Sequence, residues 1–410
     1  MRDRLACLCT FFAAAGLLAA SSAAAADWRQ FRGNDTTSVA PGRAPLTNLE
    51  SLETAAAWKT DLPGRGLSGP VLVDGRVYVT ASSGAREDRL HVLAIDAATG
   101  AVAWRRQFWA TGRTMCHPKM CNATPTPCSD GARLFAFYSS NDLICLDLEG
   151  NLLWYRGLTY DYPNASNSLG MASSPVFAGQ TLVVMVENDA ESFTVGIDPE
   201  TGEERWKLDR PKMANWTSPA VLRGPTSAED LVLIQSGAGL VALEPDTGKQ
   251  VWKYEQGCST IPSAAVGGGM VFVPSFGLTA FRVPVGQAAP EIAWREGKLA
   301  PSTPSPIYVD GIVYAINRAG AVSAGDAATG NVLWGTRLTG PFSATPVAAG
   351  GHLYCVNEEG KLQVLKVSAE KGEVVGEADL GEPILATPAI VDGALFVRGE
   401  KRLWKFQQAP

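Results

Sequence analysis

The chain is poor in the residues from which metal centres and membrane anchors are usually built. It has three histidines in 410 residues, and after residue 26 no apolar run approaches the roughly 18 residues of a membrane-spanning helix. Basic residues are also in deficit, with 35 lysines and arginines against 41 acidic residues. The negative net charge argues against nucleic acid and against an anionic membrane surface as partners.

The first 26 residues have the features of a secretory signal. Arg2 and Arg4 precede an apolar stretch over residues 5–20, and Ala24-Ala25-Ala26 is typical of a cleavage site. We therefore expect a periplasmic or secreted protein, cleaved near Ala26. Residues 27–52 are expected to be an N-terminal lead-in segment to the main domain.

Six of the eight cysteines lie after residue 26, and export permits disulfides. Cys116 and Cys121 are five positions apart in one expected loop and could form a disulfide. A zinc site there would need two further ligands, which the three histidines (His91, His117 and His352) supply poorly. The sequence predicts small buried hydrophobes rather than ligands at the three cysteines within expected strands, Cys128, Cys145 and Cys355.

Tryptophan recurs along the chain at a nearly constant spacing. The 276 residues from Trp58 to Trp334 comprise six intervals, an average of 46. Five of the tryptophans stand four places after the glycine of a turn such as Pro245-Asp246-Thr247-Gly248. A period of about 40–50 residues is typical of repeat architectures. The seven tryptophans are Trp58, Trp104, Trp154, Trp206, Trp252, Trp294 and Trp334.

Each repeat has the pattern of four short strands. It opens with Ser or Thr and Pro, then an apolar strand, an Asp-Gly or Gly-Gly turn and a second strand, as in residues 68–79. Asp-Gly between apolar runs indicates a hairpin, because both central residues of that turn need positive φ. Four strands with no amphipathic helix between them predict a propeller blade.

Counting the repeats predicts an all-β protein, an eight-bladed β-propeller of four-stranded blades over residues 53–410. The last repeat contains only three strands before Pro410. We expect residues 53–59 to supply its fourth strand and close the ring, because this would cover an open sheet edge. The seventh repeat has Gly376 at the tryptophan position, so we expect a weaker joint between blades there.

The segment Ala94-Ile95-Asp96-Ala97-Ala98-Thr99-Gly100, followed by Trp104, resembles the pyrroloquinoline-quinone repeat. Residues 196–206 and 242–252 resemble it as well, and the resemblance extends over about residues 50–410. It implies a quinoprotein-like eight-bladed propeller. In that family the tryptophan docks flat between neighbouring blades and donates its indole N–H to the backbone, and we expect this structural role for all seven tryptophans.

Two branches of this superfamily differ in function. One contains the quinoprotein alcohol dehydrogenases; the other contains non-enzymatic propellers, including the scaffold lipoprotein of the outer-membrane β-barrel assembly machinery. The dehydrogenases are longer, carry two adjacent cysteines over the quinone, and hold calcium through Glu, Asn and Asp in patterns not found here. The chain is closest in size to the scaffold branch, although that lipoprotein's lipid-attachment cysteine is absent. We therefore expect no cofactor, with pyrroloquinoline quinone and calcium as the alternative.

The candidate binding residues lie on the face opposite the Asp-Gly and Thr-Gly turns. We name that face the loop face, because it carries the long links between blades and the loops between second and third strands, and the opposite one the turn face. Long loops on a rigid scaffold commonly carry function. The most individual links belong to the first four blades. The candidates are Arg113, His117, Lys119, Asn167, Asp189, Lys212, Asn215 and Trp216.

Three functions are open at this point. We favour an exported non-catalytic scaffold, acting as a monomer or within a complex, that binds a protein, peptide or glycan on its loop face. The alternative is a quinone-dependent oxidoreductase that uses the central channel. A hydrolase or lyase has only His117, as a general base, in its support. Asn188, Asp189 and Glu191 could ligate calcium, but a solvated acidic loop is the simpler interpretation.

Overall fold

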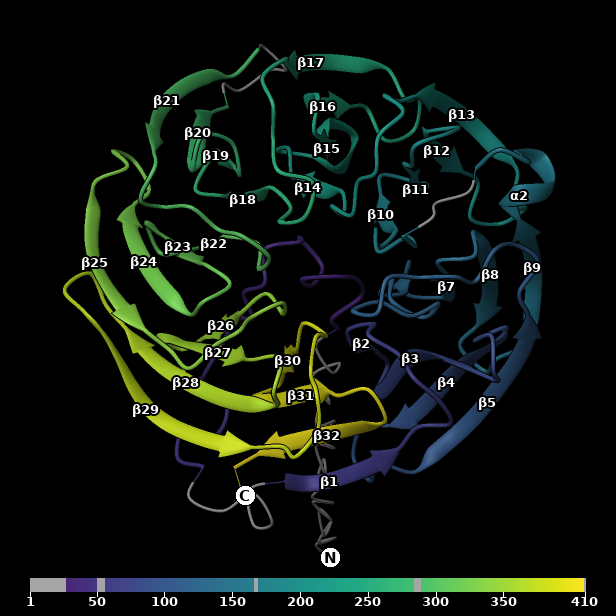
Figure 1. Cartoon of the computed structure of the whole chain (residues 1–410), viewed down its shortest axis with the longest axis horizontal. Helices are drawn as coiled ribbons and strands as arrows, with labels where there is room; N and C mark the ends of the chain where they lie inside the picture. The colour runs from purple at the N-terminus through teal and green to yellow at the C-terminus, as the bar shows by residue number, and fades with distance from the viewer. Residues whose placement is uncertain (1–26, 50–55, 166–168, 284–288, 409–410) are drawn as a thin grey trace, which may run out of the picture.

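The computed structural model describes residues 27–49, 56–165, 169–283 and 289–408. Its strands form eight four-stranded antiparallel sheets, which stand as blades around a central channel (Figure 1). The predicted all-β, eight-bladed propeller is confirmed. Among the described residues, no helix is long and apolar enough to cross a membrane.

In each blade the first strand lines the channel and the fourth lies at the rim (Figure 1). Blades one to four comprise β2 (Val71–Val73), β3 (Arg76–Ser83), β4 (Arg89–Asp96) and β5 (Val102–Trp109); β6 (Cys128–Ser129), β7 (Arg133–Phe137), β8 (Asp142–Asp147) and β9 (Leu152–Gly157); β10 (Val176–Ala178), β11 (Thr181–Val186), β12 (Phe193–Ile197) and β13 (Glu204–Asp209); and β14 (Ala220–Leu222), β15 (Leu231–Ser236), β16 (Gly239–Leu243) and β17 (Gln250–Tyr254).

Blades five to eight repeat this order, except that the rim strand of blade eight comes from the N-terminal side. They comprise β18 (Ala265–Gly267), β19 (Met270–Val273), β20 (Leu278–Arg282) and β21 (Glu291–Glu296); β22 (Ile307–Val309), β23 (Ile312–Ile316), β24 (Ala321–Asp326) and β25 (Val332–Arg337); β26 (Val347–Ala349), β27 (His352–Val356), β28 (Lys361–Val367) and β29 (Gly372–Asp379); and β30 (Ala389–Val391), β31 (Ala394–Arg398), β32 (Arg402–Gln407) and β1 (Ala56–Asp61). Two short helical turns, α2 (Leu158–Asp161) and a 3-10 turn (Ser227–Glu229), lie in the connections.

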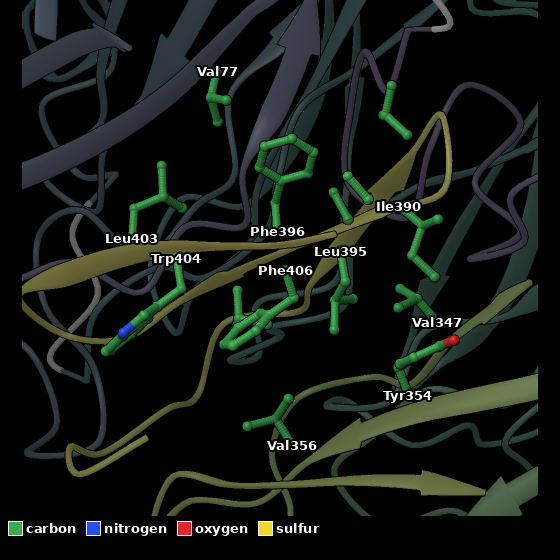
Figure 2. Packing of buried hydrophobic residues seen from close by; sticks show 14 of the residues in the cluster. Val77, Val347, Tyr354, Val356, Ile390, Leu395, Phe396, Leu403, Trp404 and Phe406 are labelled. Atoms are coloured by element: carbon green, nitrogen blue, oxygen red, sulfur yellow. The ribbon is translucent and has the colours of Figure 1, made fainter. Parts of the chain in front are cut away.

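The ring closes between the two ends of the chain, as predicted. Strand β1 pairs antiparallel with β32, with Trp58 opposite Lys405 and Lys59 opposite Trp404. The part of the predicted strand before Ala56 lies outside the described residues. The closing blade packs on both sides (Figure 2): Phe396 points toward Val77 of blade one, whereas Leu395 points toward Val347 and Tyr354 of blade seven. This alternation follows from the two-residue period of a strand.

A belt of hydroxyl groups surrounds the channel where the first strands begin. Each belt residue donates its backbone N–H to the hydroxyl of the next blade over seven consecutive bonds of 2.8–3.1 Å, which run from Gly69 through Thr126, Ser174, Ser218, Ser263, Ser305 and Thr345 to Thr387. Gly69 has no hydroxyl to continue the belt. At that seam the buried guanidinium of Arg398 donates to the Ser68 Oγ (2.7 Å) and the Thr80 carbonyl (2.7 Å).

Six of the seven tryptophans tie the rim of one blade to the turn of the next. Their indole N–H groups donate to backbone carbonyls at 2.8–3.1 Å, pairing Trp58 with Ala97, Trp104 with Leu148, Trp154 with Pro199, Trp206 with Pro245, Trp294 with Ala327 and Trp334 with Ser368. The N–H of Trp252 has no partner among the described residues. The chain segment just before the rim strand of blade five includes residues 284–288, which fall outside them.

The lead-in segment crosses the channel at its turn-face end, a feature that the sequence did not indicate. The N-terminal purple trace of Figure 1 runs through the middle of the ring. Trp28 exchanges backbone bonds of 2.9 Å with Leu72 of blade one, and Ala40 donates to Ala348 of blade seven at 2.8 Å. Between them, the segment bonds to four more blades, at the first-strand residues Ser129, Phe177 and Val221 and at Ala264, just before β18. It thereby covers first-strand edges that would otherwise be open.

The same segment fills the position of the missing tryptophan. After crossing the channel it passes blade seven, where the Tyr354 hydroxyl donates to the Pro45 carbonyl at 3.0 Å. At the rim a Cβ on Gly376 would overlap the Thr47 carbonyl. Leu49 is buried in the core shared with blade eight. Gly376 therefore leaves room for the lead-in chain at Thr47, and a weaker joint at this place stays a prediction.

Candidate functional site

The loop-face end of the channel opens into a funnel with a volume of about 730 Å³. We call this cavity the funnel. Links and loops of all eight blades contribute to its wall, rather than only those of blades one to four. Its lining residues are Leu67, His117, Lys119, Met120, Thr124, Leu169, Ala172, Trp216, Ile261, Thr303, Arg318, Ser343, Glu358 and Leu385.

Much of the funnel wall is apolar and open to solvent. Leu169 is 41% exposed and Ile261 is 45% exposed, although both lie in a concave surface. Trp216 is half-buried between them and is fixed by its indole N–H, which donates to the Gly170 carbonyl at 3.0 Å. Apolar side chains left exposed within a cavity are typical of a binding site.

An ion pair joins opposite parts of the funnel. Lys119 Nζ, on the link into blade two, lies 2.5 Å from Glu358 Oε2, on the turn between β27 and β28 of blade seven. Ser343 Oγ donates to the other carboxylate oxygen at 2.7 Å, and Arg318 Nε lies 3.9 Å from it. Burial alone would raise the pKa of Glu358, but the bonds from Lys119 and Ser343 outweigh it, so its pKa is lowered. The carboxylate therefore stays charged at neutral pH.

The link that carries Lys119 is held over the funnel by Arg65. This guanidinium donates to the Met120 carbonyl at 2.6 Å and to the Pro118 carbonyl at 2.9 Å, while its Nε pairs with Glu400 at 2.8 Å. The His117 backbone N–H donates to the Leu169 carbonyl at 2.8 Å. These contacts fix the link as part of the funnel wall.

His117 lines the funnel, and its ring is hydrogen-bonded to its own link. Its Nδ1 accepts the backbone N–H of Lys119 at 3.1 Å. Over the described parts of the chain, no serine or cysteine side chain bonds to its ring; the neighbouring Cys116 thiol donates to Ser139 Oγ at 3.3 Å. A general base needs its nucleophile within hydrogen-bond reach, and the hydrolase hypothesis gains no support from this geometry.

The structure brings three of the eight candidate residues together in the funnel: His117, Lys119 and Trp216. Arg113, Asp189 and Lys212 are exposed on the loop face outside it. Asn167 lies outside the described residues.

Asn215 is a buried part of the scaffold. It donates to Glu187 Oε2 at 2.9 Å and to the Gln235 carbonyl at 2.7 Å. Glu187 also pairs with Arg210 at 2.7 Å, and burial raises the pKa of this carboxyl. Asn215 therefore orients a buried ion pair between blades three and four.

The disulfide considered for Cys116 and Cys121 is not formed, and both thiols are free. Cys116 is half-buried and turns toward Ser139 and Gly170. Cys121 is buried in the core between blades one and two, where it contacts Thr124. The two side chains belong to different environments, and desolvation raises the pKa of the Cys121 thiol to about 11.

The loop with Asn188, Asp189 and Glu191 closes on itself. Asn188 Nδ2 donates to the Glu191 carbonyl at 2.8 Å and its Oδ1 accepts the Ala190 N–H at 2.8 Å. Glu191 lies 3.7 Å from Lys207, and Asp189 is exposed. Within the described residues, no group of three His, Cys, Asp or Glu side chains could hold a metal ion.

The funnel donors do not fit a calcium-held quinone. Calcium takes six to eight oxygen ligands from carboxylates, carbonyls and waters, and carboxylates supply the charge that balances the cation. The residues that line the funnel offer a single carboxylate, Glu358, whose oxygens are already bonded to Lys119 and Ser343.

Comparison with known proteins places this ring in a family. The sequence profile of the family described as outer membrane protein assembly factor BamB matches residues 21–191, 190–279 and 278–375. The chain belongs to this BamB family. The resemblance to quinoprotein-like propellers stated from the repeats is thereby confirmed.

Individual relatives are distant. The outer membrane protein assembly factor BamB of Burkholderia pseudomallei (strain K96243) is 26% identical over 214 residues, which are 51% of this chain and 46% of that protein. The match thus spans about half the length of this curated relative.

Solved structures from both branches share the fold. BamB from Moraxella catarrhalis superposes with a TM-score of 0.61 at 16% identity, over 86% of this chain and 97% of that chain. A europium-containing methanol dehydrogenase gives a TM-score of 0.72 at 13% identity, over 93% of this chain and 98% of that chain. Quinohemoprotein alcohol dehydrogenase from Comamonas testosteroni gives a TM-score of 0.68 at 17% identity, over 95% of this chain and 82% of that chain. At such identities these likenesses show the architecture alone.

The funnel residues that sequence reasoning missed come mostly from blades five to eight. Ile261, Arg318, Ser343, Glu358 and Leu385 stand in short connections with no unusual composition. The one sequence signal for them is that they occupy equivalent positions in successive repeats, because equivalent positions of a closed ring meet around its axis.

Proposed function

We propose that this chain is a non-catalytic scaffold of the cell envelope, which holds a protein partner on its loop face. Its BamB-family membership supports this proposal, since the relatives are named outer membrane protein assembly factors. Export of the chain, through the signal expected in residues 1–26, belongs to the same proposal. A peptide or a glycan is the alternative class of partner, and the pull-down described below distinguishes these from a whole protein.

The asymmetry between the two ends of the channel carries the proposal. The lead-in segment lies across the turn-face end, bonded to six blades. The loop-face end is the open funnel, with exposed Leu169 and Ile261 in its wall. A rigid ring with one apolar, charged opening is suited to recognition, because a scaffold that is already ordered loses little conformational entropy on binding.

Pull-down from an envelope fraction with matched surface variants tests the proposal. Lys212→Ala with Ile261→Ala changes one lysine and one aliphatic side chain on the loop face. Lys249→Ala with Leu152→Ala likewise changes one lysine and one aliphatic side chain, but on the turn face, where Lys249 is 70% exposed and Leu152 is 51% exposed. We expect partner capture to fall with the first pair and to persist with the second, at equal melting temperatures. Equal losses from both pairs, or no partner for the unmodified chain, would contradict the proposal.

The quinone-dependent alternative is tested separately. Pyrroloquinoline quinone with calcium is added to the purified protein, and the melting temperature and quinone absorbance are recorded. A ligand that binds only the folded state stabilises it by RT ln(1 + [L]/Kd), so the melting temperature rises with ligand concentration. We expect no shift, and an increase in melting temperature that grows with quinone concentration would reinstate the oxidoreductase.

A further inference from the structure

The funnel carries a surplus of positive charge. Lys119 and Arg318 are cationic, whereas Glu358 is the single carboxylate among the lining residues. Glu358 is committed to Lys119 at 2.5 Å and to Ser343 at 2.7 Å. Arg318 remains 3.9 Å from that carboxylate, with its side chain 58% exposed. Arg318 therefore shares a carboxylate that already binds two other groups, and its largely exposed guanidinium lines the cavity.

This charge stands within an apolar wall. The cavity is lined by Leu67 and Leu385, at the seam between blades eight and one. It is also lined by Leu169, Trp216 and Ile261, on the links into blades three, four and five. A ligand that matches both features must bring apolar groups and a negative charge. The cations would select ligands by their charge. Burial of the ligand's apolar surface against the wall would supply affinity.

The size of the cavity limits the ligand. About 730 Å³ lies within the range of roughly 300–1,000 Å³ that is typical of sites for small ligands. A folded domain could not enter, but a few residues of an extended loop could. The lead-in segment crosses the other end of the channel, so such a loop would enter and leave by the loop face.

We propose that the funnel binds an exposed loop of an exported protein, in which an acidic side chain is flanked by apolar ones. The carboxylate would pair with Arg318, and the flanking side chains would contact Ile261 and Trp216. This proposal rests on the proposed function and adds the chemistry of the partner. The Lys119–Glu358 pair then acts as an internal competitor, because Glu358 occupies Lys119 and repels an incoming carboxylate.

Peptide binding measured by fluorescence anisotropy tests this assignment. Three labelled peptides, acetylated and amidated so that their ends carry no charge, share an apolar sequence with one central Glu, Gln or Lys. We expect the Glu peptide to bind tightest, by about two- to fivefold over the Gln peptide, as an exposed ion pair allows. The preference should shrink at high salt.

Variants of the charged residues locate the effect. Arg318→Gln should reduce the affinity for the Glu peptide to that for the Gln peptide, whereas Glu358→Gln should increase it. Arg337→Gln is the matched control, because Arg337 is an exposed arginine of the same blade outside the funnel lining. It should change neither affinity.

Several outcomes would overturn the inference. They are equal binding of the three peptides, no binding, a preference for the Lys peptide, or equal losses from Arg318→Gln and Arg337→Gln. If none of these peptides binds but a fourth one with a free terminal carboxylate does, the funnel captures a chain end and the inference fails. If the peptides fail while loop-face variants still lose the envelope partner, only this inference fails and the scaffold function stands.

Discussion

The indole ring of Trp294 lies against the Cα of Gly330, and a Cβ there would come within 2.6 Å of the ring. Gly330 has a φ of +78° and belongs to the turn of blade six, while Trp294 belongs to the rim of blade five. The turn glycine thus serves two purposes, because it adopts positive φ and leaves room for the neighbouring tryptophan. Sites of the same kind occur at Gly100, Gly150, Gly202 and Gly248.

A pair of alanine substitutions in blade six separates these two purposes. Gly311 has a φ of +85° and nothing within 4 Å of the position of its Cβ. Gly311→Ala should cost only the backbone term of about 1–2 kcal/mol. Gly330→Ala should cost about 1–3 kcal/mol more, since it also overpacks the Trp294 site. Equal free energies of unfolding in urea for the two variants would contradict tryptophan docking as a joint between blades.

The lead-in segment should contribute substantially to stability. Trp28 is 4% exposed and packs in the core of blades one, seven and eight. Trp28→Ala should lower the free energy of unfolding by about 3–5 kcal/mol, the range for a large buried ring. Arg43→Ala, an exposed position of the same segment, is the control and should change it little. A loss below about 1 kcal/mol for Trp28→Ala would show that the segment is not part of the folded core.

Thiol titration tests the state of the cysteines. All six cysteines after residue 26 are free in the structure. The mature protein, unfolded in denaturant without reductant, should therefore yield six reactive thiols. In the folded protein reaction should be slow, because burial raises the pKa of the Cys258 thiol to about 12 and that of Cys121 to about 11. A count of four in denaturant would indicate one disulfide after all.

His91 should make the fold sensitive to mild acid. It is 3% exposed, its Nε2 lies 2.7 Å from Ser83 Oγ, and burial lowers its pKa from 6.5 to about 4, with Arg105 and Arg89 adding to the effect. The folded state thus favours the neutral ring, while the unfolded chain takes up a proton near pH 6.5. The free energy of unfolding therefore keeps its full value above pH 6.5. As the pH falls from about 6.5 to about 4, it decreases by up to about 3 kcal/mol, because protonation of His91 is less favourable in the folded state than in the unfolded chain.

Comparison of unfolding curves at pH 7 and pH 4.5 checks this expectation. His91→Gln should show a smaller loss of stability on acidification than the unmodified protein. The same dependence in both proteins would assign the acid sensitivity to other groups.

The fold could be predicted from the sequence because each of its determinants is local and repeated. Turn glycines, Asp-Gly hairpins and the tryptophan four places later fix the strands of a blade within about 40 residues. Ring closure was also predictable, since an incomplete last repeat and the unassigned Trp58 complement one another. By contrast, the lead-in segment has no repeat, and its bonds to six blades depend on the channel that it crosses.

The candidate site was predictable only where a link was long. His117, Lys119 and Trp216 stand in such links and reach the funnel, but Asn215, adjacent to Trp216, points into the scaffold toward Glu187. Neighbouring residues of an extended chain face opposite ways, and sequence alone did not show which one faces the axis. Glu358 is 239 residues from Lys119, so their pairing follows from the closed ring rather than from any local pattern.

Site-specific photocrosslinking in living cells tests the scaffold account most directly. A photoreactive amino acid is placed at Ile261 in the funnel wall or at Leu152 on the turn-face rim, which are 45% and 51% exposed. We expect the Ile261 probe to form an adduct with a defined exported protein, identified by mass spectrometry, and the Leu152 probe to form none. No adduct at Ile261, or the same adduct at both positions, would contradict a loop-face binding scaffold.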